Sequence, residues 1–249
     1  MAVAAFTIVR NEPFFLPRWL AYYGERLGYD NLTVLDNEGD DGSTDGLPCE
    51  VVRVESGGAF YHHGWIGDVV AAHFAALLKR RHEVVVYSDV DEFLVHPEGI
   101  ENAACWLHRG CARARGYDLV HMPGEAAYDL SRPILAQRSS WRRPVPPDYD
   151  KTLVGRRPLS WKRGFHRLSN KRHGPYLDGL TLVHLHLFDR GLARARHEAR
   201  QNWRWNEEER AANRGWQWML EGAALEAWFD EHLQGVEPVA EWLKQQAPF

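Results

Sequence analysis

The sequence predicts an α/β fold, in which a mostly parallel sheet is flanked by helices and followed by a helical C-terminal extension. Two observations support this class. Short apolar runs alternate with segments of helical periodicity in the first part of the chain, an order typical of parallel sheets with helices on their faces. The run VVVY at 84–87 is apolar without interruption, as expected of a strand buried on both faces. The 249 residues are enough for one large domain or two small ones.

The first half of the chain gives the clearest elements. Residues 2–9 (AVAAFTIV) predict a short buried strand. A helix follows, because Pro17 suits its first turn, apolar side chains recur at helical spacing, and Gly28 ends it. Residues 31–36 predict a second strand, which runs into the loop NEGDDGSTDG. The next expected elements are a short strand at 51–54, a helix at 66–81 with Asp68 near its start, and a strand at 83–88.

The second half is less regular. Residues 117–122 and 180–188 predict two further strands. From residue 190 onward Ala, Glu, Arg and Trp are frequent, which favours helices. We therefore expect a main domain at residues 1–190 and a helical extension at residues 191–249 packed on it.

Charge is distributed unevenly. The chain has a formal net charge of −4, but residues 132–172 contain twelve Lys or Arg against two Asp. That segment therefore carries +10 and the remainder −14. An acidic protein with one basic segment indicates an anionic ligand for that segment; the simpler interpretation is a solvated loop. A nucleic-acid-binding protein that uses residues 132–172 is an alternative, but the acidic remainder would repel a long polyanion.

The sequence also bears on where the protein works. It has no apolar run of about 18 residues, so we expect no transmembrane segment. The N-terminal stretch MAVAAFTIVRNE lacks a basic region before its apolar part, so we expect no signal peptide. Three Cys fit a reduced protein with inert thiols. We expect a cytoplasmic protein, and peripheral contact at the inner face of the membrane is compatible with this.

Three carboxylates follow the strand predicted at 83–88. In SDVDEFL, Asp89, Asp91 and Glu92 lie close together. Because side chains alternate along a strand, Asp89 and Asp91 are expected on the same side. Two such carboxylates repel unless a cation or a proton intervenes, and their oxygens suit Mg²⁺ or Mn²⁺. The alternative is an N-cap with surface carboxylates at a strand-to-helix turn.

Polar groups follow the two preceding strands as well. Arg10, Asn11 and Glu12 come directly after the first strand, and Asp36 and Asn37 lie at the end of the second. Open parallel sheets bind ligands at the carboxyl ends of their strands. The convergence of these groups with the carboxylates of SDVDEFL is the main functional signal in the sequence.

Four stretches, in this order, carry a family resemblance: VRNEPFFLPRWLAYYGERLGYDNLTVLDNEGDDGSTDG, SDVDEFL, KTLVGRRPLSWKRGFHRL and LVHLHLFD. They resemble glycosyltransferases of the GT-A fold, in particular a family 2-like group related to family 92-type enzymes. The resemblance covers residues 7–189. It implies a GT-A-like, Rossmann-type sheet and metal-dependent transfer of a sugar from a nucleoside-diphosphate sugar, most often a UDP-sugar, to an acceptor hydroxyl. It also favours inversion at the anomeric carbon and a role in polysaccharide or glycoconjugate synthesis.

The resemblance implies roles for single residues. Mn²⁺ or Mg²⁺ would be held by Asp89 and Asp91 with a late histidine, His184 or His186. These histidines alternate with apolar residues, so both face one side and spacing cannot choose between them; each could also be a core histidine. The implied nucleotide-binding residues are Arg10, Asn11, Glu12, Asp36, Asp68 and Asp89. The residues expected at the diphosphate are Lys151, Lys162, Arg163 and His166. They belong to a mobile lid within 142–172, which the +10 charge, the run RRPVPPDYD and the glycines 155 and 164 predict.

Inversion requires a carboxylate that takes the proton of the acceptor hydroxyl. The candidates are Glu92, Glu125, Asp129 and Asp178, of which we favour Glu125 and Asp178 because they lie beyond the nucleotide-binding half. The eleven Trp residues offer aromatic surfaces for a sugar acceptor. Trp141 or Trp161 is expected there, whereas the Trp residues after position 200 are expected to pack the C-terminal helices.

Two other functions compete with glycosyl transfer. A haloacid-dehalogenase-like phosphatase also has an Asp-x-Asp after an apolar strand, but that motif normally opens the chain, whereas here it follows two strand–helix units. A domain that binds a sugar nucleotide without turning it over is the second. The presence of Asp89, Asp91 and the late histidines argues against it.

Overall fold

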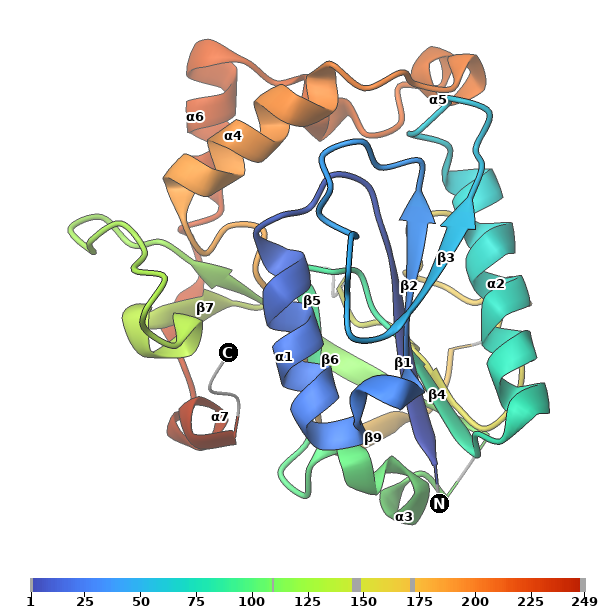
Figure 1. Cartoon of the computed structure of the whole chain (residues 1–249). Helices are drawn as coiled ribbons and strands as arrows, with labels where there is room; N and C mark the ends of the chain where they lie inside the picture. Colours follow the sequence, from blue (N-terminus) through green and yellow to red (C-terminus); the bar gives the residue numbers. More distant parts are fainter. Residues whose placement is uncertain (1, 109, 145–148, 171–172, 247–249) are drawn as a thin grey trace.

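The computed structural model describes residues 2–108, 110–144, 149–170 and 173–246. A mixed sheet runs through the molecule in the order β10-β7-β6-β8-β4-β1-β2-β3, with β9 paired to β6 and β5, and helices pack around it (Figure 1). The strands are β1 (Val3–Val9), β2 (Leu32–Asn37), β3 (Glu50–Val54), β4 (Val84–Tyr87), β5 (Glu92–Val95), β6 (Cys111–Val120), β7 (Ser140–Arg142), β8 (Val154–Gly155), β9 (Tyr176–His184) and β10 (Val236–Pro238). The helices are α1 (Phe15–Leu27), α2 (His63–Arg80), α3 (Ala103–Trp106), α4 (Arg190–Gln201), α5 (Glu207–Ala211), α6 (Gly222–Glu231) and α7 (Glu241–Gln246).

Four parallel strands form the first half of the sheet, with β1 between β2 and β4 and with β3 beyond β2. Tyr87 of β4 packs on Phe6 of β1, which contacts Phe74 of α2. The next residue, Ser88, accepts a hydrogen bond of 2.9 Å from Trp19 Nε1 of α1. Because successive side chains point to opposite faces, α1 and α2 cover opposite faces of the sheet. The predicted α/β fold, with a parallel sheet flanked by helices, is confirmed.

The second half of the sheet is mainly antiparallel. β8 lies between β4 and β6 and is antiparallel to both, while β9 is parallel to β6 and antiparallel to β5. The strands expected at 117–122 and 180–188 both begin earlier, β6 at Cys111 and β9 at Tyr176. In β6 the stretch CARARG alternates buried alanines with half-buried arginines. That alternation is a strand pattern, but a search for continuous apolar runs misses it.

The C-terminal segment lies over the carboxyl ends of the parallel strands. In Figure 1, α4 and α5 lie above the arrowheads of β2 and β3, and Arg196 of α4 reaches Asp91, which follows β4. The extension expected at residues 191–249 contains helices, but β10 within it also pairs with β7. Its separation from residues 1–190 as a domain stays a prediction.

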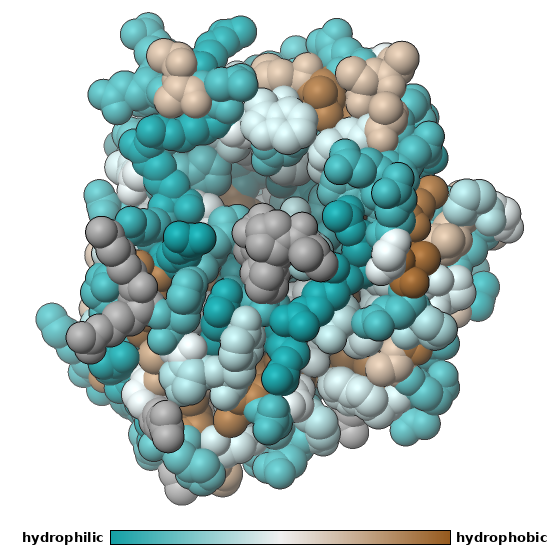
Figure 2. Space-filling model, turned by 180° about the vertical axis from the view of Figure 1, so that it is seen from behind, coloured by the Kyte–Doolittle hydropathy of each residue, from teal (hydrophilic) through white to brown (hydrophobic). Residues whose placement is uncertain are grey.

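The surface carries no obvious apolar face in the view of Figure 2. Hydrophilic side chains cover most of that face, and hydrophobic residues form small, separate patches. Scattered apolar residues of this kind are normal on protein surfaces. Within the described ranges, no helix has both the length and the apolar character needed to cross a bilayer.

Candidate functional site

A cavity of about 280 Å³ lies at the carboxyl ends of β1, β2 and β4. Arg10 follows β1, Asn37 ends β2 and Asp89 follows β4, and all three line the cavity. Its other walls come from residues 164–166, from the end of β9 and from the C-terminal segment. This is the position at which open parallel sheets bind ligands.

Asp89, Glu92 and Lys151 form an ion-pair cluster on the cavity wall. The Lys151 ammonium donates to Glu92 Oε1 at 2.5 Å and to Asp89 Oδ2 at 3.4 Å, and the Tyr87 hydroxyl donates to Asp89 Oδ1 at 2.6 Å. Burial raises the pKa of Glu92 to about 8, although Lys151 acts in the opposite direction. Burial alone would lower the pKa of Lys151, but the carboxylates of Glu92 and Asp89 raise it overall. A charged lysine therefore lies beside a buried carboxyl group whose pKa is raised by burial.

Asp91 is held by an arginine from the C-terminal segment. Arg196 NH1 donates to Asp91 Oδ2 at 2.6 Å, and NH2 of the same guanidinium donates to Glu12 Oε2 at 3.0 Å. Burial alone would raise the pKa of Asp91, but Arg196, with smaller contributions from His184 and Arg200, holds it well below its usual range. Asp91 is therefore ionised, and its charge is balanced by the protein itself.

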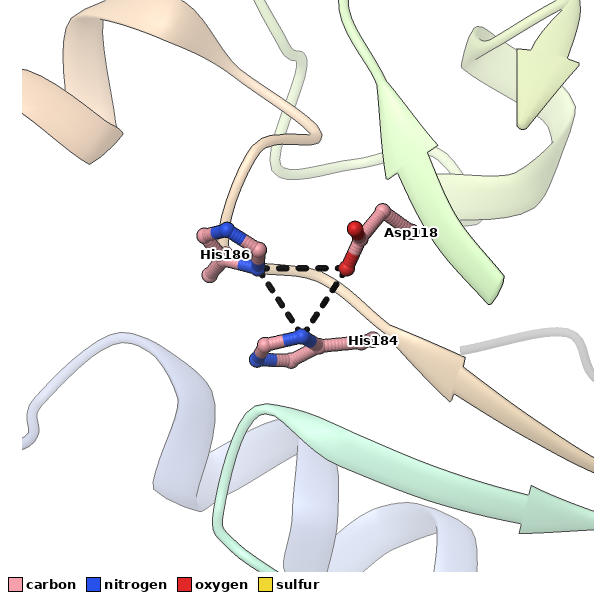
Figure 3. A group of neighbouring side chains, drawn as sticks. All are labelled: Asp118, His184 and His186. Atoms are coloured by element: carbon pink, nitrogen blue, oxygen red, sulfur yellow. Dashed lines mark hydrogen bonds and ion pairs between the residues drawn. The ribbon is translucent and has the colours of Figure 1, made fainter. Parts of the chain in front are cut away.

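Two histidines and an aspartate meet at the end of β9. Their nearest atoms are close: His184 Nδ1 and His186 Nδ1 are 2.9 Å apart, and Asp118 Oδ1 lies 3.0 Å from the first and 3.4 Å from the second (Figure 3). Burial lowers the pKa of His184 to about 4 and that of His186 well below its usual value. Neutral imidazoles of this kind are common metal ligands.

The metal implied by the family resemblance can be compared with these groups. Asp89 and Asp91 each face a protein cation, at 3.4 and 2.6 Å, whereas the two histidines converge with Asp118. The donor set of Asp118, His184 and His186 fits a divalent ion. Asp91 approaches the same group, with Oδ2 3.9 Å from His184 Nε2. Metal binding by Asp89, Asp91, His184 and His186 stays a prediction.

The structure brings many of the predicted site residues together, and others lie elsewhere. Those on the cavity wall are Arg10, Asp89, Asp91, Lys151, His166, His184 and His186. Those that do not line it are Asn11, Glu12, Asp36, Asp68, Lys162 and Arg163. Only the first group can touch a ligand in the cavity as the structure stands.

Asn11 and Asp36 instead organise the loop after β2. Asn11 Oδ1 accepts from the Asp40 amide at 2.9 Å. Asp36 accepts from the Gly39 amide at 2.7 Å and from Arg53 at 2.8 Å. Their role is therefore to shape the loop beside the cavity, and direct nucleotide contact stays a prediction for both. Asp68 is exposed on α2.

The two favoured base candidates lie away from the cavity. Glu125 accepts from the amides of Met122 and Ser139 at 2.9 and 2.8 Å, so it closes a loop. The side chain of Asp178 is fully exposed at the start of β9 and faces Arg115. Neither carboxylate lines the cavity, and a role as base stays a prediction for both. Of the four candidates, Glu92 lines the cavity.

The tryptophans on the cavity wall also differ from those expected. Trp141 stacks on Tyr117 with ring centroids 4.1 Å apart, and Trp161 packs in the core beneath the sheet, so neither lines the cavity. Trp203, Trp218 and Trp228 of the C-terminal segment line it instead. These three line it because the C-terminal segment lies over the strand ends, which periodicity does not reveal; the place of the acceptor stays a prediction.

The basic segment contributes to the cavity only in part. Gly164, Phe165 and His166 line it, while the neighbouring Lys162 and Arg163 are exposed. Lys171 and Arg172, also counted in the segment, lie outside the described residues. Closure of this segment over a ligand stays a prediction.

Two important side chains were missed from the sequence. Asp118 lies within the strand expected at 117–122, and a carboxylate at an apolar strand position is a signal that could have been used. Arg196 belongs to a helix with many arginines, and no local pattern separates it from its neighbours. Its contact with Asp91 spans 105 residues.

The similarity of this chain to known proteins is in structure only. No protein-family model matches the sequence, and no curated protein matches it. Two crystal structures of S. aureus TarS, one of residues 1–349, are similar to 53% and 55% of this chain at 12% and 14% identity, each with a TM-score of 0.30. This chain covers 24% and 43% of those TarS chains, less than half of either. The fold class therefore rests on the sheet topology of this chain.

Proposed function

We propose that this protein is a metal-dependent glycosyltransferase. It would move a sugar from a nucleoside-diphosphate sugar, most simply a UDP-sugar, to the hydroxyl of a saccharide or glycoconjugate, with inversion. The observation that carries the proposal is the cavity at the carboxyl ends of β1, β2 and β4, where carboxylates, neutral histidines and a buried lysine meet. Such a set can hold a diphosphate, stabilise it as a leaving group and accept a proton.

The nucleotide would bind beside Arg10. The Arg10 guanidinium lies 3.4 Å from the centroid of the Phe60 ring and donates to the Asn37 carbonyl oxygen at 3.2 Å, so its plane is fixed. A flat, fixed group of this kind can stack on a base. The Asn37 side-chain oxygen is buried and has no hydrogen-bond partner among the described residues, and it could accept from the N3–H of uracil.

The diphosphate would bind between Lys151 and the histidines. A divalent metal would supply positive charge to the leaving diphosphate. Lys151 provides a second, permanent positive charge 3.4 Å from Asp89, and His166 lines the cavity nearby. Charges that are fixed before the donor binds stabilise the leaving group without reorganisation.

Glu92 is the base that the geometry favours. It lines the cavity, and its Oε2 is buried without a hydrogen-bond partner among the described residues. Burial raises its pKa to about 8, close to the working pH at which a general base is most effective. The acceptor would bind against Trp203, Trp218 and Trp228, whose rings can cover the apolar faces of a sugar. Arg200 lies over Trp218 at 3.8 Å and adds a charged donor to this wall.

A melting-temperature screen against nucleotides and nucleotide sugars, with and without Mn²⁺, tests the proposal. Ligand at about 100 times its Kd should stabilise the fold by roughly 2.7 kcal/mol, which raises Tm by roughly 5–10 °C. The shift should be lost in Lys151→Met and kept in Lys79→Met, a matched change of an exposed lysine on α2. If no nucleotide raises Tm and phosphate is released from monoesters instead, the phosphatase alternative replaces this proposal. A cytoplasmic location stays a prediction, as does peripheral membrane contact.

A further inference from the structure

We propose that Asp118, His184 and His186 form a binding site for a divalent transition-metal ion such as Zn²⁺, Co²⁺ or Mn²⁺, and that this ion binds before any nucleotide does. The inference deepens the proposed function, because it names the protein ligands of the metal and moves them away from Asp89 and Asp91. It is tested with metal alone, so its outcome does not depend on glycosyl transfer.

The spacing of the three ligand atoms suits a metal ion. With bonds of about 2.1 Å, ligand atoms in the same coordination shell lie about 3.0 Å apart at right angles and about 3.4 Å apart in a tetrahedron. The distances among Asp118 Oδ1, His184 Nδ1 and His186 Nδ1 are 2.9, 3.0 and 3.4 Å. Hydrogen bonds account for them less well, because each neutral imidazole carries one proton and the three short edges cannot all be hydrogen bonds. One cation between the three atoms satisfies every edge.

The burial of the Asp118 carboxylate also supports a bound cation. Its side chain is completely buried, and Oδ2 has no hydrogen-bond partner in the described part of the chain. Within the same residues its ion-pair contacts are with His184 and His186, and Arg142 and Lys151 act on it only from beyond ion-pair distance. A buried carboxylate without a cation is costly. A bound metal ion would provide the missing positive charge.

The backbone fixes the ligands, which favours a preformed site. Asp118 and His184 are register partners on the adjacent strands β6 and β9. His186 is held two residues further on, because the Leu185 amide donates to the Asp91 carbonyl oxygen at 2.9 Å. Metal-binding histidines commonly present their second ring nitrogen to a carboxylate. Asp91 Oδ2 lies 3.9 Å from His184 Nε2 and is itself fixed by Arg196, so Asp91 is a positioning residue.

The ligand types favour certain ions, and the cavity would let a ligand reach the bound ion. Two imidazoles and one carboxylate suit Zn²⁺, Mn²⁺, Fe²⁺ or Co²⁺, whereas Mg²⁺ prefers oxygen ligands and retains its waters. His184 and His186 line the cavity, so an ion held by them would keep open coordination positions on that side. A diphosphate entering the cavity could occupy those positions.

The experiment uses the full chain, stripped with a chelator, and titrates it with Co²⁺ or Zn²⁺ in the absence of nucleotide. We expect one equivalent to bind, with a Co²⁺ absorption spectrum typical of nitrogen ligation, and about 100-fold excess Mg²⁺ should not displace it. Asp118→Asn and His186→Gln should each weaken binding at least about 100-fold, and Asp91→Asn about 10–100-fold. Asp89→Asn, the same change in a cavity residue outside the set, should leave the affinity within about threefold.

Several results would overturn the site. One is the absence of Co²⁺ and Zn²⁺ binding to the stripped wild-type chain. Another is a loss in Asp89→Asn as large as that in His186→Gln, which would place the ion on SDVDEFL. If Asp118→Asn does not fold, as judged by circular dichroism, His186→Gln decides alone, because its side chain borders the cavity. Metal bound by these residues in a chain that binds no nucleotide would support the site and refute the proposed function. Mn²⁺-dependent transfer by wild type, together with Co²⁺ affinity unchanged in His186→Gln, would do the reverse.

Discussion

Arg196 makes the strongest test of how the C-terminal segment holds the site. Its guanidinium joins two carboxylates that belong to distant parts of the chain, Asp91 at 2.6 Å and Glu12 at 3.0 Å. The side chains of all three residues are about nine-tenths buried. Replacing Arg196 by Met keeps much of the apolar stem but leaves both carboxylates without their main cation.

The expected loss follows from burial. Breaking a buried ion pair by removing one partner costs about 3–5 kcal/mol, because the remaining charge is left uncompensated. For a chain of this length, that should lower Tm by roughly 6–20 °C. The folded-state pKa of Asp91 is depressed below its ordinary value of 3.8, so its contribution to stability is present above that pH and is lost as pH falls. The deficit of the Arg196→Met variant should therefore be largest near neutral pH and shrink in acid.

The loss in the free energy of unfolding can be measured by urea unfolding of wild type, Arg196→Met and a matched control. The control is Arg194→Met, on the same helix, whose side chain is 45% exposed and pairs with the half-exposed Glu226. Exposed pairs contribute at most about 1 kcal/mol, so this variant should lose no more than that. The Asp91→Asn change added to Arg196→Met should recover part of the loss. If Arg196→Met and Arg194→Met lose the same small free energy of unfolding, burial does not make the Arg196 ion pairs stronger.

Three further predictions concern the site. Glu92→Gln should lower kcat about 10²–10⁴-fold while UDP affinity, measured by calorimetry, stays unchanged; a normal kcat would exclude Glu92 as base. Trp218→Ala should raise the acceptor KM and leave the donor KM alone; a change in the donor KM only would move the acceptor site elsewhere. Burial, then Arg200 and Arg196, lower the pKa of His197 from 6.5 to about 4. The stability that neutral His197 contributes is present above pH 6.5 and is lost as pH falls through about 4. Over that window the free energy of unfolding of wild type should fall by about 2 kcal/mol more than that of His197→Phe. Parallel pH profiles of the two proteins would contradict this.

The strand ends of the parallel half could be predicted because the signal there is local. A run such as VVVY is long enough to show burial on both faces, and the polar residues that follow it must lie at the carboxyl end of the strand. Arg10, Asp89 and Asp91, expected at these strand ends, all line the cavity. Asn37, from the polar cluster expected at the end of the second strand, also lines the cavity.

The base candidates show the limit of this reasoning. Glu125 and Asp178 were preferred for their place in the order of the chain, but order says nothing about which face a loop presents. Glu125 is occupied by two backbone amides, and Asp178 points into solvent. Glu92 directly follows the predicted metal ligand Asp91, and it is buried in contact with Lys151.

The sequence by itself determined the alternation of strands and helices, the parallel half of the sheet and the carboxylates at its edge, because hydrophobic period and turn residues act over a few positions. Tertiary structure alone decided what those carboxylates meet. Arg196 reaches Asp91 across 105 residues, and Asp118 reaches His184 across 66. Contacts at such separations depend on the register of β6 against β9 and on where α4 packs, and these are set by the packing of the whole core, which no short stretch of sequence records.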